Sequence, residues 1–469
     1  MGCLDLPAAK RVPGAPDSDW VMYAPNEYDL ALIHNPLAYQ LSREIGRQAP
    51  RTRFVEVLLK RDRGQSSPIN LPNFSASGDY HGIYVFMEKI KIGRNRVNID
   101  RLHEGDAKAP AVTGGYLWKI DRPDSSEVGF VGAGRTIRYV DPDERAMRSP
   151  AREAQREYLK DYFRDFGLAL KGADFRDPER GYRRYIDMDS WIDHHILNVV
   201  LFNVDALHLS AYFHKPRNGR LTMGPLWDMD RAMGSTDARD FNPTKFGRIS
   251  SSWSADFFKD AWWKRLFADP DFWQAWIDRY QELREGPLRR EHIMEVVEGM
   301  FDELREAEPR ERTRWRRYPR SGVQSTNGYT FDFGQREYDS ELRFKRQWFS
   351  DRLSFIDTNL LSRPVFSHAG GEVPGRLVLK ISAAPGSSIY YTLDGTDPRA
   401  TGGPTNAVPP SLSALEYTGP IVIDANTRLV ARAYNPRHNN LTGKSNPPIS
   451  SHWSGPRKAV YNLPKPNRR

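Results

Sequence analysis

The residues best suited to chemistry are three aspartates in the segment FNVDALHLSAYFHKPRNGRLTMGPLWDMDRAMGS, residues 202–235. Asp205 follows a predicted helix, and 23 residues later a predicted hairpin leads into Asp228 and Asp230. Phosphoryl transfer can use such a set, because one aspartate can orient the attacking hydroxyl while another holds Mg²⁺ against the phosphates. Aspartates beside turns also cap helices or face solvent, so the spacing alone leaves a purely structural role open.

Periodicity and turn signals predict the elements that position these acids. Residues 211–214 and 221–226 flank Asn218-Gly219, a strong hairpin signal between Asp205 and Asp228. Apolar residues at helical spacing predict helices at 28–47, 150–168, 188–202, 254–267, 270–285, 289–306 and 336–361. Short alternating runs predict strands at 53–59, 80–90 and 115–120. The acids therefore lie where a helical region is interrupted by a small β island.

The composition changes near Arg363-Pro364, where helical periodicity disappears. Short β-rich runs such as SIYYTLDG and TRLVARAY follow, separated by Gly, Pro and Asn turns. This pattern predicts an all-β, immunoglobulin-like sandwich over 364–450. Residues 451–469, ending in PKPNRR, are predicted to form a loose basic tail.

Length and composition limit the classes of protein to consider. The 469 residues are too many for one compact core, and 39 % hydrophobic residues suffice for real interiors. Cys3 is the only cysteine, which excludes an internal disulfide framework and a cysteine-based metal site. No apolar run is long enough for a transmembrane segment, and the first residues lack the apolar core of a secretion signal.

The formal charge is +9, and one stretch is rich in arginine. The run consists of Arg310, Arg312, Arg314, Arg316, Arg317 and Arg320. A solvated charged loop is the simpler interpretation, and a docking patch for an acidic partner is the alternative. No nucleic-acid-binding motif accompanies the run, so nucleic acid is not an expected partner.

Several motifs occur together in a fixed order. They are DSDWVMYAPNEYDLALIHNPLAYQLSREIGRQAPRTRFVEVLLK, DYHGIYVFMEKIKIGRNRVNIDRL, GGYLWKIDRPD, NVDALHLSAYF and GPLWDMDRAMGS. In this order the set resembles the spore-coat CotH kinase family. The resemblance implies an α+β fold with a kinase-like two-lobed domain over 1–363. An apparently incomplete N-terminal lobe and hinge would occupy 1–140, and a helical C-terminal lobe 141–363.

The resemblance also implies roles for individual residues. Asp205 matches the catalytic-loop aspartate, and Asp228 matches the metal-binding aspartate, with Asp230 as a second ligand. Asn203 would shape the loop that presents Asp205, and Glu88 matches a hinge-region glutamate near the adenine. Together with Ser210, these two residues form the implied cofactor-binding set. The implied cofactors are ATP and Mg²⁺, and the implied substrate is a protein with Ser/Thr acceptors.

Two departures from the family pattern leave the activity open. Kinases place an Asn five positions after the catalytic aspartate, and here that position is Ser210, a poorer fixed Mg²⁺ ligand. Before Trp20 there is no R-x-R-G-x-S/T pattern, and Lys10 has no predicted strand around it. Either the chain is a fragment or has a misplaced start, or half of the phosphate clamp is missing. A non-catalytic (pseudokinase) surface scaffold is therefore the alternative function. A glycoside hydrolase is a weaker one, since Asp228 and Asp230 do not by themselves face across a sugar site.

The β-rich region carries a resemblance of its own. Residues 390–398 (YYTLDGTDP), 417–421 and 428–434 resemble the chitobiase/β-hexosaminidase C-terminal module. Such modules accompany extracellular, often carbohydrate-active, bacterial proteins, so a glycan or envelope contact is an expectation. Family resemblance likewise implies an extracytoplasmic location, secreted or at the cell surface.

Overall fold

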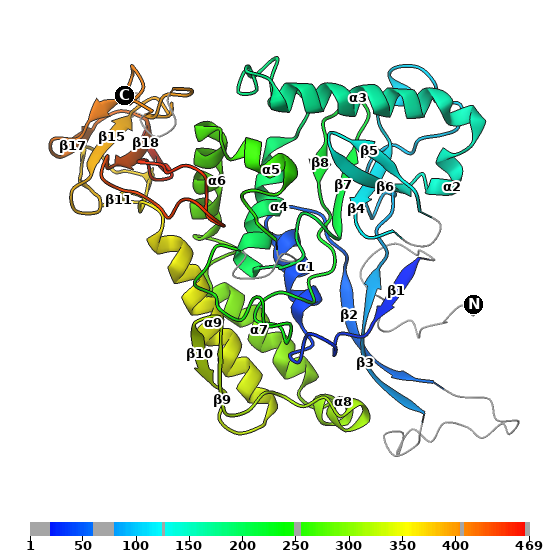
Figure 1. Ribbon diagram of the computed structural model, residues 1–469. Helices are drawn as coiled ribbons and strands as arrows, with labels where there is room; N and C mark the ends of the chain where they lie inside the picture. Colours follow the sequence, from blue (N-terminus) through cyan, green and yellow to red (C-terminus); the bar gives the residue numbers. More distant parts are fainter. Residues whose placement is uncertain (1–18, 60–78, 124–126, 248–254, 404–407, 465–469) are drawn as a thin grey trace, which may run out of the picture.

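The computed structural model describes residues 19–59, 79–123, 127–247, 255–403 and 408–464. Lys10, Ser254 and residues 465–469 of the predicted tail lie outside these ranges. The fold is mixed α and β, with one large hydrophobic core between Ala31 and Leu360, a second between Phe366 and Tyr461, and a small third cluster that contains Ile92 and Leu117. The second core belongs to a separate β-rich module, orange and red in Figure 1.

The first strands form a small antiparallel sheet in the order β1-β3-β2. Its members are β1 (Trp20–Tyr23), β2 (Thr52–Leu58) and β3 (Tyr80–Glu88). Helix α1 covers His34–Glu44, shorter than the predicted 28–47. The reason is local: Leu32 has a left-handed φ of +65°, which a continuous helix excludes, and the Asp29 carboxylate accepts the His34 N–H at 2.6 Å.

A second sheet has five strands in the order β5-β6-β4-β7-β8. Its strands are β4 (Tyr116–Ile120), β5 (Phe130–Gly132), β6 (Arg135–Asp141), β7 (Ala211–Lys215) and β8 (Thr222–Met223). The predicted hairpin is confirmed as β7 and β8. Because β4 pairs with β7, one sheet spans the lobe boundary placed at residue 140. Composition cannot reveal such a pairing between distant segments.

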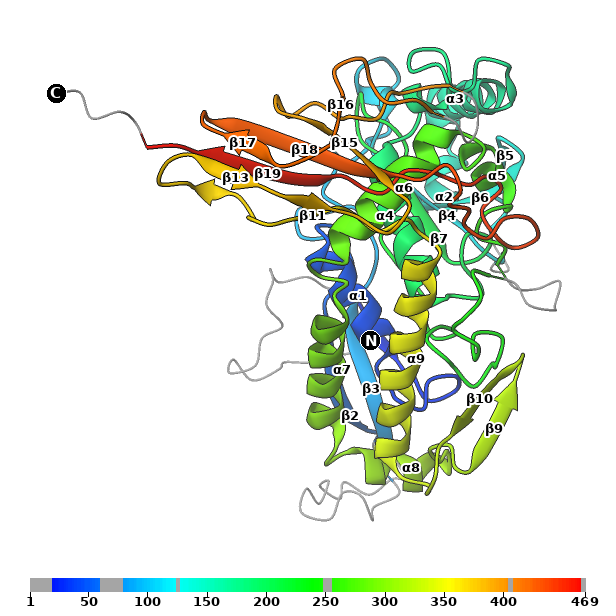
Figure 2. The ribbon, with the colours of Figure 1, turned by 90° about the vertical axis from the view of Figure 1, so that its left-hand side faces the viewer.

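The remaining helices lie around the two sheets and α1 (Figures 1 and 2). They are α2 (Glu144–Met147), α3 (Glu153–Lys171), α4 (Met188–Leu201), α5 (Ala261–Leu266), α6 (Pro270–Leu283), α7 (Arg290–Leu304), α8 (Glu308–Trp315) and α9 (Tyr338–Thr358). A hairpin of β9 (Val323–Thr326) and β10 (Tyr329–Asp332) precedes α9. The arginine run is not simply a loop, because α8 contains its first three members.

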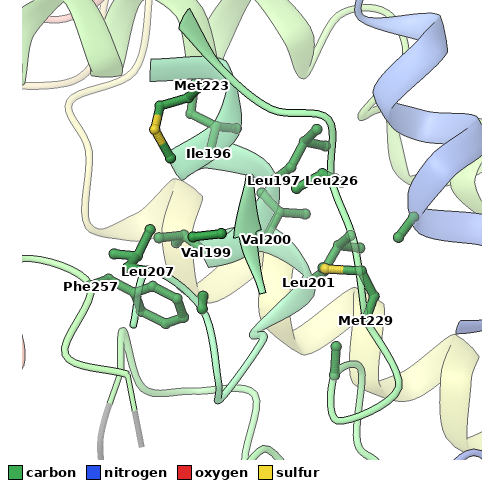
Figure 3. Packing of buried hydrophobic residues seen from close by; sticks show 14 of the residues in the cluster. Ile196, Leu197, Val199, Val200, Leu201, Leu207, Met223, Leu226, Met229 and Phe257 are labelled. Carbon is green, nitrogen blue, oxygen red and sulfur yellow. The ribbon is translucent and has the colours of Figure 1, made fainter. Parts of the chain in front are cut away.

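Helix α4 is the central packing element, with Ser190 to Leu201 buried throughout. Figure 3 shows Leu201 of α4 and Met229 side by side, with Leu226 near Leu197. Burying an aliphatic side chain of this size contributes roughly 1.5–3 kcal/mol. This packing ties the segment that carries Asp228 and Asp230 to α4.

The C-terminal module contains a five-stranded sheet in the order β12-β19-β18-β15-β16. These strands are β12 (Gly371–Glu372), β15 (Ser388–Thr392), β16 (Leu415–Glu416), β18 (Thr427–Tyr434) and β19 (Arg457–Asn462). Two further pairs join β11 (Val365–Phe366) to β14 (Ile381–Ser382) and β13 (Leu377–Leu379) to β17 (Ile421–Ile423). The loose tail predicted from 451 is wrong over 457–462. There Ala459 and Tyr461 are buried and β19 pairs with β12 and β18.

A cluster of ion pairs fixes this module against α6. Arg432 of β18 is 2 % exposed and donates two hydrogen bonds of 2.6 Å to the Asp278 carboxylate. Its Nε donates to Asp397 at 2.7 Å. Arg399 adds a bond of 2.8 Å to Asp271 at the start of α6. We call these five residues the interdomain cluster.

Candidate functional site

Two chain segments run together at the end of α4 and bring the acids near one another. Phe202 ends α4 with a left-handed φ of +51°. The Val204 N–H then donates to the Arg231 carbonyl at 3.2 Å, and the Met233 N–H donates to the Leu201 carbonyl at 2.8 Å. These bonds place the loop of Asp205 beside the residues that follow Asp228 and Asp230.

Asp228 and Ser210 meet directly. The Ser210 hydroxyl donates to Asp228 Oδ2 at 3.1 Å, so the position five after Asp205 reaches the predicted metal ligand. Both residues have left-handed backbones, with φ of +50° at Ser210 and +58° at Asp228. Left-handed conformations at residues other than glycine cost free energy and concentrate at functional sites.

The local electrostatics favour protonation of both acids. Burial raises the pKa of Asp228, and the charges of Asp121 and Asp205 raise it further against the Ser210 hydrogen bond. Burial, followed by the charge of Asp228, raises the pKa of Asp230. A cation bound between such carboxylates would relieve this cost, which is the pattern of a ligand site.

Asp205 lies in an ion-paired environment. Its Oδ1 is 3.1 Å from Arg239 Nη2, and its Oδ2 is 3.8 Å from Arg231 Nε. Both arginines also pair with Asp237, and the Arg231 guanidinium lies 4.0 Å from the ring centroid of Tyr28. Arg231 and Arg239 thus bring positive charge next to the acids. Sequence reasoning did not select them, because arginines are frequent throughout this chain.

The side-chain amide of Asn203 forms hydrogen bonds with other groups of the protein. Its Oδ1 accepts the Asp205 N–H at 3.1 Å, and its Nδ2 is 3.2 Å from both Asn198 Oδ1 and Met229 Sδ. Since Asn203 is only 3 % exposed, it is placed to shape the loop of Asp205. This geometry fits the loop-shaping part of its predicted role better than direct contact with a cofactor.

Glu88 is likewise engaged by protein groups. Its carboxylate accepts hydrogen bonds from Arg51 Nε at 2.7 Å and from Arg96, which stacks over Trp20 at 5.1 Å. The cavity that Glu88 lines with Ala49 measures about 10 Å³, enough for one water and far too small for an adenine. In this conformation the Glu88 carboxylate fixes the end of β3.

Side chains from α1 hold the backbone of the metal-ligand segment. Asp228 N–H donates to the Tyr39 hydroxyl at 3.2 Å, and Met229 N–H donates to Asn35 Oδ1 at 2.7 Å. Their roles were missed because Tyr39 and Asn35 precede their partners by almost 200 residues, so local spacing carries no signal.

The donor set fits Mg²⁺ with a nucleotide better than a metal held by protein alone. No group of three or more His, Cys, Asp and Glu within the described ranges forms a metal cluster. Mg²⁺ commonly takes one or two carboxylates and fills its remaining positions with phosphate oxygens and water. Asp228 and Asp230 could supply those carboxylates.

Comparison with known proteins assigns the chain to a family. A family model described as CotH kinase protein matches residues 8–356, well over half of the chain. A model described as Fn3 associated matches residues 377–446, within the β-rich module, which was expected to be of chitobiase type. A search of curated proteins finds no match. Across the described ranges, no helix has the length and apolarity to cross a membrane. On the extent of the first match, the chain belongs to the CotH kinase family.

Proposed function

We propose that this protein is an atypical protein kinase that uses ATP and Mg²⁺ to phosphorylate Ser or Thr residues of a protein substrate. The observation that carries the proposal is the convergence of Asp205, Ser210, Asp228 and Asp230 at the end of α4. Membership of the CotH kinase family supports it. Phosphoryl transfer depends mainly on positioning and charge neutralisation, and this site offers groups for both.

Each residue has a defined task under this proposal. Asp228 and Asp230 would hold Mg²⁺, which when bound neutralises the phosphate oxygens. Asp205 would orient the acceptor hydroxyl and take up its proton, while Arg239 and Arg231 fix the direction of its carboxylate. Ser210 holds Oδ2 of Asp228 in place. Asn203 keeps the loop of Asp205 in register with Met229.

The first test is isothermal titration of Mg·ATP into the chain and into its Asp228→Asn variant. Since a second-sphere ligand alone commonly changes metal affinity 10- to 100-fold, loss of this direct ligand should weaken binding by at least about 100-fold. The matched control is Asp302→Asn, an exposed acid on α7 whose side chain is 74 % accessible. Equal affinity of Asp228→Asn and the unaltered chain would contradict the proposed metal site.

Transfer itself is tested by incorporation of labelled γ-phosphate into a mixture of Ser- and Thr-containing peptides. Asp205→Asn should bind Mg·ATP like the unaltered chain and lose roughly 10²–10⁴-fold in transfer rate, the usual range for general acid–base groups. Normal binding with no transfer by the unaltered chain would instead favour the second candidate, a non-catalytic scaffold. That candidate draws support from the arginine pairing of Asp205 and from Ser210 at the position of the usual Asn.

The setting of this activity is part of the proposal. An extracytoplasmic location and a surface or secreted substrate follow from the spore-coat association of the family. The β-rich module would contribute an envelope or glycan contact. Because the interdomain cluster fixes it against α6, any such partner would be held at a defined position relative to the catalytic domain.

A further inference from the structure

A buried lysine contacts residues next to the Asp228–Asp230 segment. Lys345 belongs to α9, which runs beside α1 (Figure 2). It is 1 % exposed, and its Nζ lies 2.6 Å from His34 Nε2 and 2.5 Å from the Met233 carbonyl oxygen. Burying an ammonium group is costly, so the hydrogen bonds that Lys345 donates must offset part of that cost.

His34 connects that lysine to the proposed metal site. It lies in the first turn of α1, is 1 % exposed, and its Nδ1 is 3.0 Å from the Asp230 carbonyl oxygen. Together with the bonds from Asn35 and Tyr39, it gives each of the three residues 228–230 one backbone contact with α1. The segment is therefore held residue by residue by one helix.

The contacts determine which ring nitrogen of His34 carries the hydrogen. An ammonium group only donates hydrogen bonds, so Nε2 beside Lys345 must accept. Nδ1 then carries the hydrogen and donates it to the Asp230 carbonyl, which can only accept. The opposite tautomer would face the Asp230 carbonyl with a lone pair and leave Lys345 without this acceptor. Asp29 Oδ1 lies 3.2 Å from the same Nε2 and is the competing partner, because it would accept a hydrogen from that nitrogen. Lys345 Nζ is the nearer group at 2.6 Å, so the lysine decides the tautomer.

We propose that Lys345 is a positioning residue that acts through His34, fixing its Nδ1–H tautomer and thereby the backbone of the Asp228–Asp230 segment. Its functional consequence, tighter binding of Mg·ATP, rests on the proposed function. The tautomer and the segment geometry do not. Outer groups that orient metal ligands typically change metal affinity 10- to 100-fold when removed.

The decisive measurement on the unaltered protein is the ¹⁵N spectrum of histidine-labelled chain, with the His34 signals assigned by their loss in His34→Gln. The expected result is the Nδ1–H tautomer at His34. An Nε2–H tautomer overturns the inference. This readout requires neither bound nucleotide nor a substituted lysine, so it decides the matter even if a Lys345 variant does not fold or the phosphotransfer proposal fails.

The consequence is tested with a pair of variants of similar size. Lys345→Met removes the donor and should lose the His34 tautomer signal and weaken Mg·ATP binding about 10-fold. Lys345→Gln keeps an N–H donor and should restore part of both. Lys160→Met, at a side chain 71 % exposed on α3, is the control and should change neither. A folded Lys345→Met protein with unchanged His34 signals overturns the positioning role.

Discussion

The pKa values of buried aspartates shift in opposite directions in two parts of this molecule. At the candidate site, burial and neighbouring acids raise the pKa values of Asp228 and Asp230. In the interdomain cluster, burial also acts to raise the pKa of Asp397, but the hydrogen bonds and charge of Arg432 outweigh it and lower that pKa. One set of acids lacks full compensation, and the other is neutralised by a guanidinium with matching geometry.

Under the proposed function, this difference separates a ligand site from a structural contact between domains. Acids kept close together without enough cations reduce stability, and buried carboxyls with raised pKa values are candidates for a ligand site. Acids satisfied by arginine need nothing more, and the interdomain cluster therefore needs no ligand.

We expect the largest change in stability in the interdomain cluster. Arg432→Met should lower the free energy of unfolding by about 3 kcal/mol, because removing one partner leaves Asp278 and Asp397 without their shared cation. Chemical denaturation followed by tryptophan fluorescence measures this change. Mg·ATP affinity, measured on the same sample, should remain unchanged. If Arg432→Met weakened Mg·ATP binding as much as Asp228→Asn does, the interdomain cluster and the candidate site would not be independent.

The second prediction concerns pH, because Asp230 and Asp397 are expected to be protonated in different pH ranges. Asp230 has a raised pKa in the folded chain, so as the pH falls it is protonated above the ordinary aspartate value of 3.8. Metal binding needs the ionised form, so Mg·ATP affinity should drop about tenfold per pH unit below that raised pKa. Asp397 behaves oppositely: its stabilising contribution is present above 3.8 and is lost only at lower pH, through its depressed pKa.

Titrations of Mg·ATP at a series of pH values from about 8 to about 5 test this prediction, since ordinary aspartates do not change charge in that range. In Asp230→Asn the pH dependence should be much flatter, because Asp228 alone remains to titrate. Affinity that is constant over this range in the unaltered chain would contradict a shared carboxylate site.

The smallest effect comes from a matched pair of isosteric substitutions. Asp230→Asn removes a charge from the repelling set and should raise the free energy of unfolding by about 0.5–1 kcal/mol, as stabilising changes at active sites commonly do. Asp397→Asn removes a charge that Arg432 uses and should lower it by about 1 kcal/mol. Thermal unfolding of both variants under the same buffer compares them directly. If both variants shifted the free energy of unfolding in the same direction, the two regions would not differ in the way described.

The sequence predicts which acids and which hairpin form the candidate site. It does not predict the distant residues that hold them in place. Asp205, the hairpin and Asp228 lie within a short stretch whose turn signal is local, so the sequence predicts their proximity. Lys345 meets His34 across 311 positions, and only the packing of α9 beside α1 brings them together. The same limit explains β19: its six residues, RKAVYN, form only a short run beside a basic chain end, and neighbours from distant strands bury Ala459 and Tyr461.

The placement of β19 also has a consequence for synthesis of the chain. Although last of the described strands in sequence, it lies inside its sheet, with Gly371 opposite Tyr461 on one side and β18 on the other. Domains generally fold in the order in which they emerge from the ribosome, and pairing between distant strands is slow. The CotH kinase domain can therefore complete its own core before residues 457–462 of the β-rich module have been synthesised. Until they arrive, β12 and the β18 edge remain exposed to other chains and to proteases.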